Sequence, residues 1–325
     1  MKKASIIGFG YWGPKVYKTL ISLKIEVKYI CDLNKKNFDK QLFQNVKFIS
    51  DIDLICRDNE INSVYICTEP KSHFHLCKML LKSRKNVFVE KPICTNIKQF
   101  KILKKLATEN RIILYEDLIY TKSNHIIYLE NLILKKKYKP FLFQTIRSNL
   151  GKVDFETDVI EDLSHHDLSI VLLLFKRLPT RCFAKLIQPN NKVPKSIAEI
   201  YLEFGNKLFC TISLSWYSPI KIRKIFIHTE TEMIDFDDIE PDKKIKIFKR
   251  MIVKKHKEIS YRLGGIIIPN VISNYSPLEN SINEFNKLIK TKSKNNKHLE
   301  LSKNILIIKT FIRKSLSLGR FVTIN

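Results

Sequence analysis

The sequence predicts two domains: an α/β domain with a doubly wound parallel sheet over residues 1–118, and an α+β domain with a largely antiparallel open sheet over residues 119–325. In the first part, short apolar runs alternate with helical stretches of about ten to fifteen residues, which is typical of a parallel sheet. After residue 118 this alternation stops, and later runs switch between apolar and polar residues, as half-buried antiparallel strands do. A chain of 325 residues can bury two such cores.

The expected elements follow in order along the chain. In the first domain the strands are expected at 4–7, 27–32, 46–50, 63–68, 86–90 and 111–116, with helices between them. In the second domain the strands are expected at 140–150, 196–204, 207–216, 223–229, 243–255 and 320–324. The helices of that domain are expected at 123–137, 162–175 and 276–318. Lysines interleave with apolar residues at 243–255, which suggests a solvated face or a guarded edge strand.

Three glycines form the most informative motif. Gly8, Gly10 and Gly13 stand between the first apolar run and a helical stretch, and Asp32 closes the next apolar run. In a dinucleotide-binding turn the first glycine permits the tight bend, the second lets the backbone approach a pyrophosphate, and the third lets helix and strand pack closely. A carboxylate about 20 residues later accepts hydrogen bonds from the adenosine ribose. The motif therefore predicts a dinucleotide site that favours NAD over NADP, although Lys35 and Lys36 could offset the repulsion of a 2′-phosphate.

Two further junctions lie at the carboxyl ends of predicted strands, where open α/β sheets bind ligands. One is the loop from Thr68 to His73, and the other is Glu90-Lys91-Pro92. A lysine held between a strand end and a proline is an unusual place for a merely solvated charge.

Asp162 and His166 are four residues apart in a predicted helix and so share one face. An imidazole titrates near neutrality and can take a hydroxyl proton, while the carboxylate one turn away orients it or binds substrate. The alternative is an N-capping aspartate and a partly buried histidine with a satisfied hydrogen bond.

Composition limits the function classes. The formal net charge is +26, yet only 11 of the 58 basic residues are arginine and the lysines are spread along the whole chain, which argues against a nucleic-acid interface. The positive field can still attract an anionic substrate. The seven cysteines form no CxxC pair, so neither disulfides nor a metal site is expected. No apolar run approaches the ~20 residues of a membrane span, and the glycines interrupt any signal-peptide core, so we expect a soluble cytoplasmic protein.

These motifs resemble those of the Gfo/Idh/MocA family of NAD(P)-dependent sugar and cyclitol dehydrogenases, nearly from end to end. The resemblance rests on the glycine turn, on Thr68, Pro70 and His73, on the Glu-Lys-Pro motif, and on the Asp-His pair. It implies that Lys91 contacts nicotinamide ribose and substrate, that His166 is the general base and that Asp162 binds substrate. The cofactor-binding residues implied are Gly8, Gly10, Tyr11, Trp12, Gly13, Asp32, Thr68, Pro70, His73, Glu90 and Lys91.

The second domain further resembles the branch that acts on nucleotide-linked amino sugars or uronic acids. The matching segments are 147–151, 162–170, 215–224 and 276–285. They imply substrate contacts from Arg147 and Asn149, although Arg147 could instead be a structural ion pair. Ser164, His165 and Ser276 depart from the branch's usual residues, as does Glu69 within the Thr-Pro-Pro loop, but no catalytic group is lost.

The reaction implied is hydride transfer between a sugar carbinol carbon and nicotinamide, with NAD as cofactor and NADP not excluded. A free sugar or inositol dehydrogenase, or a ketosugar reductase, would use the same residues. A non-catalytic NAD-binding regulator is an alternative of another class, and the retained Lys91, Asp162 and His166 argue against it. We also expect a homo-oligomer through the second domain's sheet, and no nucleic-acid or membrane partner.

Overall fold

A computed structural model describes residues 3–34, 45–135, 138–150, 156–255, 258–292 and 297–324. The chain divides into two compact units, each formed from two segments. The first unit comprises Met1–Ser123 and Asn274–Leu306, and the second comprises Asn124–Ser273 and Ile307–Asn325. Lys35 and Lys36, invoked above for cofactor preference, lie outside the described residues.

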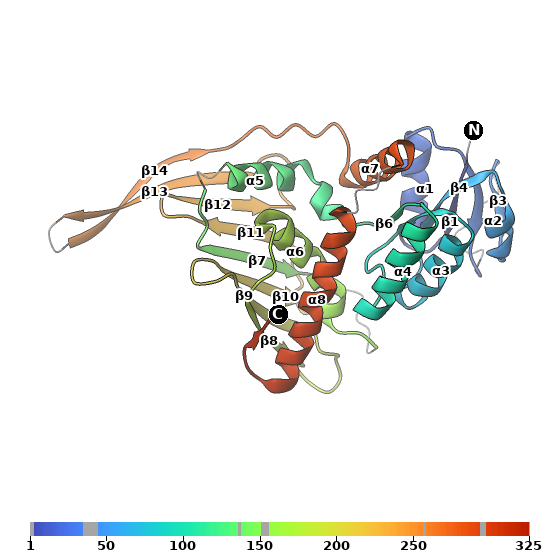
Figure 1. The fold of residues 1–325 in the computed structure, drawn as a ribbon. Coiled ribbons are helices and arrows are strands. Elements are labelled where there is room, and N and C mark those ends of the chain that lie inside the picture. The colour runs from blue at the N-terminus through green and yellow to red at the C-terminus, as the bar shows by residue number, and fades with distance from the viewer. Residues whose placement is uncertain are drawn as a thin grey trace. The chain divides into compact units, whose positions relative to one another are not determined.

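The first unit contains a six-stranded parallel sheet in the order β3-β2-β1-β4-β5-β6 (Figure 1). The strands are β1 (Lys3–Ile7), β2 (Val27–Cys31), β3 (Lys47–Ile49), β4 (Ile61–Ile66), β5 (Asn86–Val89) and β6 (Leu114–Glu116). The order reverses beside β1, so the carboxyl ends of β1 and β4 flank the point where such sheets bind dinucleotides. The predicted doubly wound parallel sheet is confirmed.

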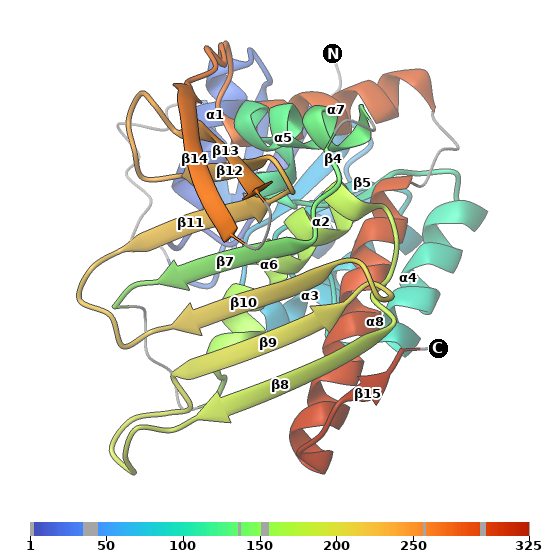
Figure 2. The same cartoon turned by 90° about the vertical axis from the view of Figure 1, so that its left-hand side faces the viewer.

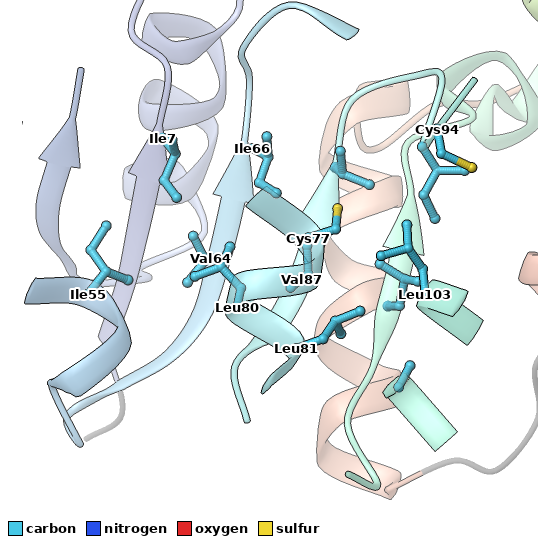
Figure 3. Packing of buried hydrophobic residues seen from close by; sticks show 14 of the residues in the cluster. Ile7, Ile55, Val64, Ile66, Cys77, Leu80, Leu81, Val87, Cys94 and Leu103 are labelled. Atoms are coloured by element: carbon cyan, nitrogen blue, oxygen red, sulfur yellow. The ribbon is translucent and has the colours of Figure 1, made fainter. Parts of the chain in front are cut away.

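Helices cover both faces of this sheet. They are α1 (Gly13–Ser22), α2 (Asp53–Arg57), α3 (Pro70–Lys82), α4 (Ile97–Glu109) and the 3-10 turn η2 (Ile119–Lys122). On one face Ile66, Val64 and Val87 of the strands form a core with Cys77 and Leu80 of α3 (Figure 3). Apolar side chains on both faces of the sheet are buried, which explains why these strands are nearly continuous apolar runs.

The other face is covered in part by α7 (Pro277–Thr291), which comes from far along the chain. Its residues Leu278, Ile282 and Phe285 join the core formed by strand residues such as Phe88. The expected boundary at 118/119 thus differs from the observed division in two ways: the first segment continues to Ser123, and residues 274–306 return to the first unit. The apolar stripe of α7 predicts a buried face, but not which core it joins.

The second unit contains a nine-stranded sheet in the order β14-β13-β12-β11-β7-β10-β9-β8-β15 (Figure 2). The strands are β7 (Leu142–Ser148), β8 (Arg181–Ile187), β9 (Ile197–Glu203), β10 (Phe209–Ser215), β11 (Ile222–His228), β12 (Glu232–Asp237), β13 (Ile245–Lys255), β14 (Glu258–Ile267) and β15 (Val322–Thr323). Among the described strands of this second sheet, only β7 and β10 pair in parallel. The predicted, largely antiparallel sheet is confirmed.

The guarded-edge interpretation of residues 243–255 is wrong, because β14 lies outside β13 and forms the edge of the sheet. Pairing of β13 with β12 stops at Lys249, whereas its pairing with β14 runs on to Lys255. The two strands therefore continue as a two-stranded ribbon (Figure 1).

Three helices complete the second unit. They are α5 (Asn124–Leu134), α6 (Val159–Phe175) and α8 (Lys297–Leu318), whose first turns belong to the first unit. Strands β9 and β10 alternate strictly between buried and half-buried positions, so one face of the sheet is core. No helix in the described ranges has both the length and the apolar character needed to span a membrane.

Candidate active site

The glycine turn at the end of β1 has the geometry that a dinucleotide requires. Gly8 has φ of 90°, and a side-chain carbon on it would lie 2.7 Å from the Thr68 amide nitrogen. A side-chain carbon on Gly13 would lie 2.3 Å from the Gly8 carbonyl oxygen, so α1 packs against this turn without room for a methyl group. At Gly10 such an atom would meet nothing within 4 Å, which leaves open space over the backbone. The bend at Gly8, the open backbone at Gly10 and the close packing at Gly13 are the features for which a dinucleotide-binding turn uses glycine.

Tyr11 and Trp12 lie between the second and third glycine. Their rings pack edge to face with centroids 5.8 Å apart, and Tyr11 is 76% exposed. Lys15, in the first turn of α1, places its Nζ atom 3.5 Å from the centre of the Tyr11 ring. The sequence analysis did not single out this lysine, although a basic residue just after a glycine turn can indicate an anion-binding site. It adds a positive charge where the N-terminus of α1 already favours an anion.

Asp32 lies directly after β2, beside the glycine turn. One carboxylate oxygen accepts the Phe9 N–H at 2.5 Å, and the other accepts the Asn34 N–H at 2.8 Å. Each oxygen keeps a lone pair for a further donor. Asp32 is half-buried and can therefore receive hydrogen bonds from a ribose while the backbone holds it in place.

Asp32 leads to a prediction about cofactor choice. NAD or NADH is expected to bind more tightly than the phosphorylated forms, because the carboxylate repels a 2′-phosphate. In isothermal titration, Asp32→Ala is expected to narrow that difference. Equal affinities of the unmodified protein for NADH and NADPH would contradict the assignment. Asp51→Asn, which changes an exposed carboxylate in the same unit, is the control.

Lys91 is half-buried. The loop that carries it is fixed by two buried side chains, His73 and Glu116, which contact its backbone on either side. His73, which is fully buried on α3, contacts the Pro92 carbonyl oxygen through Nδ1 at 2.8 Å and the Thr68 carbonyl oxygen through Nε2 at 2.9 Å. On the far side, Glu116 accepts the Ile93 N–H at 2.7 Å. These contacts join the Thr68 loop to the Lys91 loop and leave His73 as a positioning residue that is remote from solvent.

Burial lowers the pKa of His73, while the two carbonyl contacts and Glu116 oppose that shift. The neutral imidazole is therefore favoured, and its one N–H can donate to only one of the two carbonyl groups.

The remaining predicted residues of the first unit lie on the same edge of the sheet. Thr68 is half-buried and shares a 2.6 Å hydrogen bond with Ser72. Pro70 is exposed and occupies the first turn of α3, where its missing N–H costs nothing. Glu90, directly before Lys91, is 8% exposed.

In the second unit, Asp162 and His166 lie one turn apart on α6. Twelve of the helix's 17 residues are buried, but these two are only half-buried and share a face. The indole N–H of Trp216 donates to Asp162 at 3.1 Å, and Trp216 itself is 2% exposed. Asp162 is therefore fixed by a buried neighbour, which sequence reasoning missed although it had singled out the segment 215–224.

A network of charges fixes the start of α6. Asp158, not Asp162, is the N-cap and accepts the N–H groups of Ile160 and Glu161 at 3.0 and 3.1 Å. Arg313 donates to Asp158 and Glu161 at 2.6 Å each, and Lys309 pairs with Glu161. Burial would raise the pKa of Glu161, but Lys309 and Arg313 lower it to about 2.

These same charges line a cavity of about 390 Å³. Its walls do not include Asp162 or His166, and three of its charged groups, Asp158, Glu161 and Arg313, pair with one another. The cavity is therefore part of the support of α6.

Arg147 lies in β7 and is 5% exposed. Its Nε donates to the Oδ2 atom of Asp167 in α6 at 2.7 Å, and its Nη2 donates to the Oδ1 atom of the same carboxylate at 3.3 Å. This arrangement favours the ion-pair interpretation left open by the sequence, in which Arg147 joins the sheet to α6 next to His166. Asn149 is half-buried just beyond β7, and its N–H donates to the Ser215 carbonyl at 3.0 Å.

Residues 2–117 match the model of the Gfo/Idh/MocA oxidoreductase family, NAD-binding Rossmann fold. A segment of 66 residues is 38% identical to the uncharacterized oxidoreductase YhhX of Escherichia coli K12, and the match spans 20% of this chain and 19% of that protein.

Solved structures match over almost the whole length. UDP-N-acetylglucosamine 3-dehydrogenase GnnA from Acidithiobacillus ferrooxidans is 16% identical, with a TM-score of 0.80 over 97% of both chains. A protein from Sinorhizobium meliloti 1021, described as a candidate myo-inositol dehydrogenase, is 13% identical, with a TM-score of 0.81 over 100% of both chains. At these identities the likeness shows a shared two-domain fold.

The family match covers the sheet that carries the glycine turn, Asp32 and Lys91. The open backbone at Gly10 and the close packing at Gly13 fit the NAD(P) cofactor of such domains. Residues 2–117 therefore form a domain that is similar to the NAD-binding Rossmann domain of the Gfo/Idh/MocA oxidoreductase family.

Proposed function

We propose that the protein is an NAD(P)-dependent oxidoreductase that transfers a hydride between nicotinamide and a secondary hydroxyl or ketone of a sugar. The observation that carries the proposal is the pair Asp162 and His166, which share a half-buried face of a helix in which 12 of the 17 residues are buried. A regulator that only binds NAD would not need an imidazole and a carboxylate held in this way by Trp216 and the network at Arg313.

Three residues divide the chemistry. His166 takes the hydroxyl proton as the alcohol is oxidised, because an imidazole exchanges protons near neutral pH. Lys91 stabilises the developing alkoxide with its positive charge. Asp162, fixed by Trp216, binds a substrate hydroxyl. When bound, the nicotinamide supplies the hydride acceptor or donor, and the protein supplies position and charge.

We further propose a nucleotide-linked sugar as substrate. The resemblance of the second domain to the nucleotide-sugar branch and the fold shared with GnnA support this class. The excess of basic residues would favour a substrate that carries a diphosphate. Because Asp167 engages Arg147, other basic groups are the better candidates for that contact. A free sugar or inositol is the alternative, which the likeness to the Sinorhizobium protein favours.

The two substrate classes differ in a measurable way. Turnover with a UDP- or dTDP-linked sugar is expected to exceed turnover with the free sugar, because binding energy from a remote diphosphate helps position the reacting carbon. The bare nucleoside diphosphate should inhibit competitively, and KM should rise with ionic strength as exposed charges are screened. Absorbance of reduced cofactor follows all three. Turnover on inositol or glucose that neither salt nor the nucleoside diphosphate affects would overturn the nucleotide-sugar proposal. The proposed oxidoreductase activity would still stand.

We also propose that the protein forms a homo-oligomer through the half-buried face of the second sheet. On that face the rings of Phe183, Tyr201 and Phe209 form a continuous row, with centroids 5.9 and 6.0 Å apart. Light scattering is expected to give a multiple of 38.3 kDa, and Tyr201→Glu is expected to shift the protein toward the monomer. A wild-type mass of one chain at micromolar concentration would overturn this proposal.

A further inference from the structure

Two buried carboxyl groups lie side by side where β5 and β6 end. Val89 and Glu116 are partners in the parallel register, and Glu90 and Asp117 are the next residues on the two strands. The strands still run together there, because the Asp117 N–H donates to the Val89 carbonyl at 2.8 Å. Successive side chains of a strand alternate between faces, so Glu90 and Asp117 lie on the same face of the sheet.

The residues below and above this pair exclude water from it. Two positions earlier on the same strands, Phe88 and Tyr115 stack with ring centroids 5.4 Å apart. Helix α7 covers the row with Phe285, and its Ser281 donates a 2.6 Å hydrogen bond to Asp117. Glu90 is 8% exposed and Asp117 2%. The Oε1 atom of Glu90 is buried without a hydrogen-bond partner among the described residues.

Several ionisable groups act on this carboxyl pair from the elements around it. They are Cys67 after β4, Tyr115 and Glu116 of β6, Lys91, and Lys122 of η2. Glu284 of α7 acts on Tyr115 and pairs with Lys122. Lys122 is partly engaged elsewhere, because its Nζ lies 2.5 Å from Glu284.

Burial, and then the charge of Asp117, raise the pKa of Glu90 well above its usual range. Burial raises the pKa of Asp117 to about 7, although the hydrogen bond from Ser281 and the charge of Lys122 oppose the shift. Two adjacent buried carboxyl groups cannot both ionise readily, so the pair keeps at least one proton at neutral pH.

The position of the pair in the sheet determines which part of the cofactor is near it. A dinucleotide lies across the point where the strand order reverses. Asp32, after β2, belongs to the adenosine half, so the nicotinamide half lies on the side of β4, β5 and β6. Lys91, the residue predicted to contact the nicotinamide ribose, directly follows Glu90. The oxidised ring carries one positive charge more than the reduced ring, while the phosphates and riboses are the same.

We propose that Glu90 and Asp117 form a proton-linked pair that makes the protein select the oxidised cofactor increasingly as pH rises. Binding of the positively charged ring favours the ionised pair, so one proton leaves the pair for solvent when oxidised cofactor binds. Binding of the neutral, reduced ring releases none. The linkage is reciprocal: removing the proton by raising pH strengthens binding of the oxidised form by the same factor. This inference rests on cofactor binding by the first unit and makes no assumption about the substrate.

Isothermal titration of the full chain with NAD+ and with NADH from pH 6 to 8 tests the linkage. The dissociation constant for NAD+ is expected to fall with rising pH, by at most about tenfold per pH unit for one linked proton. The dissociation constant for NADH should change by less than about twofold over the same range. Because NAD+ and NADH carry the same phosphates, the comparison with NADH also corrects for titration of groups near the phosphates. Titrations at pH 7 in two buffers with different ionisation enthalpies count the protons directly: release on binding NAD+ and none on binding NADH is expected.

Two variants assign the effect to the pair. Asp117→Asn, which keeps an acceptor for Ser281, and Glu90→Gln should each remove most of the pH dependence of the affinity ratio, which is the dissociation constant for NAD+ divided by that for NADH. Glu109→Gln, an exposed carboxylate on α4, should retain it. A flat ratio in the wild type, or a ratio that still varies in both variants, would overturn the proposal. If neither variant folds, the proton count on the wild type decides. Failure of both cofactors to bind would overturn the cofactor assignment and this inference together.

Discussion

His166→Ala is expected to reduce turnover by about 10² or more, because a positioned general base contributes at least that factor. Lys91→Ala is expected to have a loss of similar size, since the alkoxide would form without a neighbouring positive charge. Both side chains are only half-buried, so the fold should remain intact. Steady-state rates of cofactor reduction, together with thermal melting curves, measure the two effects separately.

Two surface variants serve as matched controls. His75→Ala on α3 and Lys101→Ala on α4 remove the same side-chain types from exposed positions and should retain normal turnover. Near-normal turnover in His166→Ala would place the base elsewhere. The next candidates are Lys91 and Tyr120, a half-buried residue of η2. A rate lost equally in the control variants would point to a general loss of folded protein.

The first domain could be predicted from sequence because each local signal agrees with its neighbours. Gly8, Gly10 and Gly13 stand between a strand and a helix, and the period of the apolar residues changes at each boundary. The spacing of Asp162 and His166 was enough to place them on one face of a helix, because the helical repeat is fixed. Short-range geometry of this kind needs no knowledge of the rest of the fold.

The supports of the site could not be predicted, because they come from distant parts of the chain. Arg313 reaches Asp158 across 155 positions, and Trp216 reaches Asp162 across 54. The sequence analysis began this helix at Asp162 and considered an N-cap only there. Only the packed structure assigns it to Asp158.

Three strands were missed for local reasons. The inward residues of β8 include Cys182 and Ala184, which are too small to give strong alternation. In β12, Glu232 and Asp235 are acidic residues, which strands disfavour, and their partners in β13 are Lys249 and Lys246. The Gly-Gly pair within β14 suggests a turn in isolation. Pairing across the sheet overrides each of these local preferences.

The glycine turn allows cofactor binding to be separated from folding. Gly13→Ala is expected to destabilise the first unit by about 1 to 3 kcal/mol, as an overpacked core does, because the new carbon would lie 2.3 Å from the Gly8 carbonyl oxygen. Gly10→Ala is expected to leave the melting temperature unchanged, since nothing lies within 4 Å of the added carbon. Thermal denaturation without cofactor measures both effects.

Gly10→Ala, which should leave stability unchanged, is expected to weaken cofactor binding. The methyl group of Gly10→Ala would occupy the open space over the backbone, so a pyrophosphate would lose close contact with the N–H groups there. A lost hydrogen bond to a charged group lowers affinity by about tenfold or more. Gly265→Ala, at a position in β14 that also has nothing within 4 Å, should alter neither stability nor binding. If Gly10→Ala bound NADH as tightly as the parent, the pyrophosphate would have to lie away from Gly10, and the assignment of this turn as its binding site would fail.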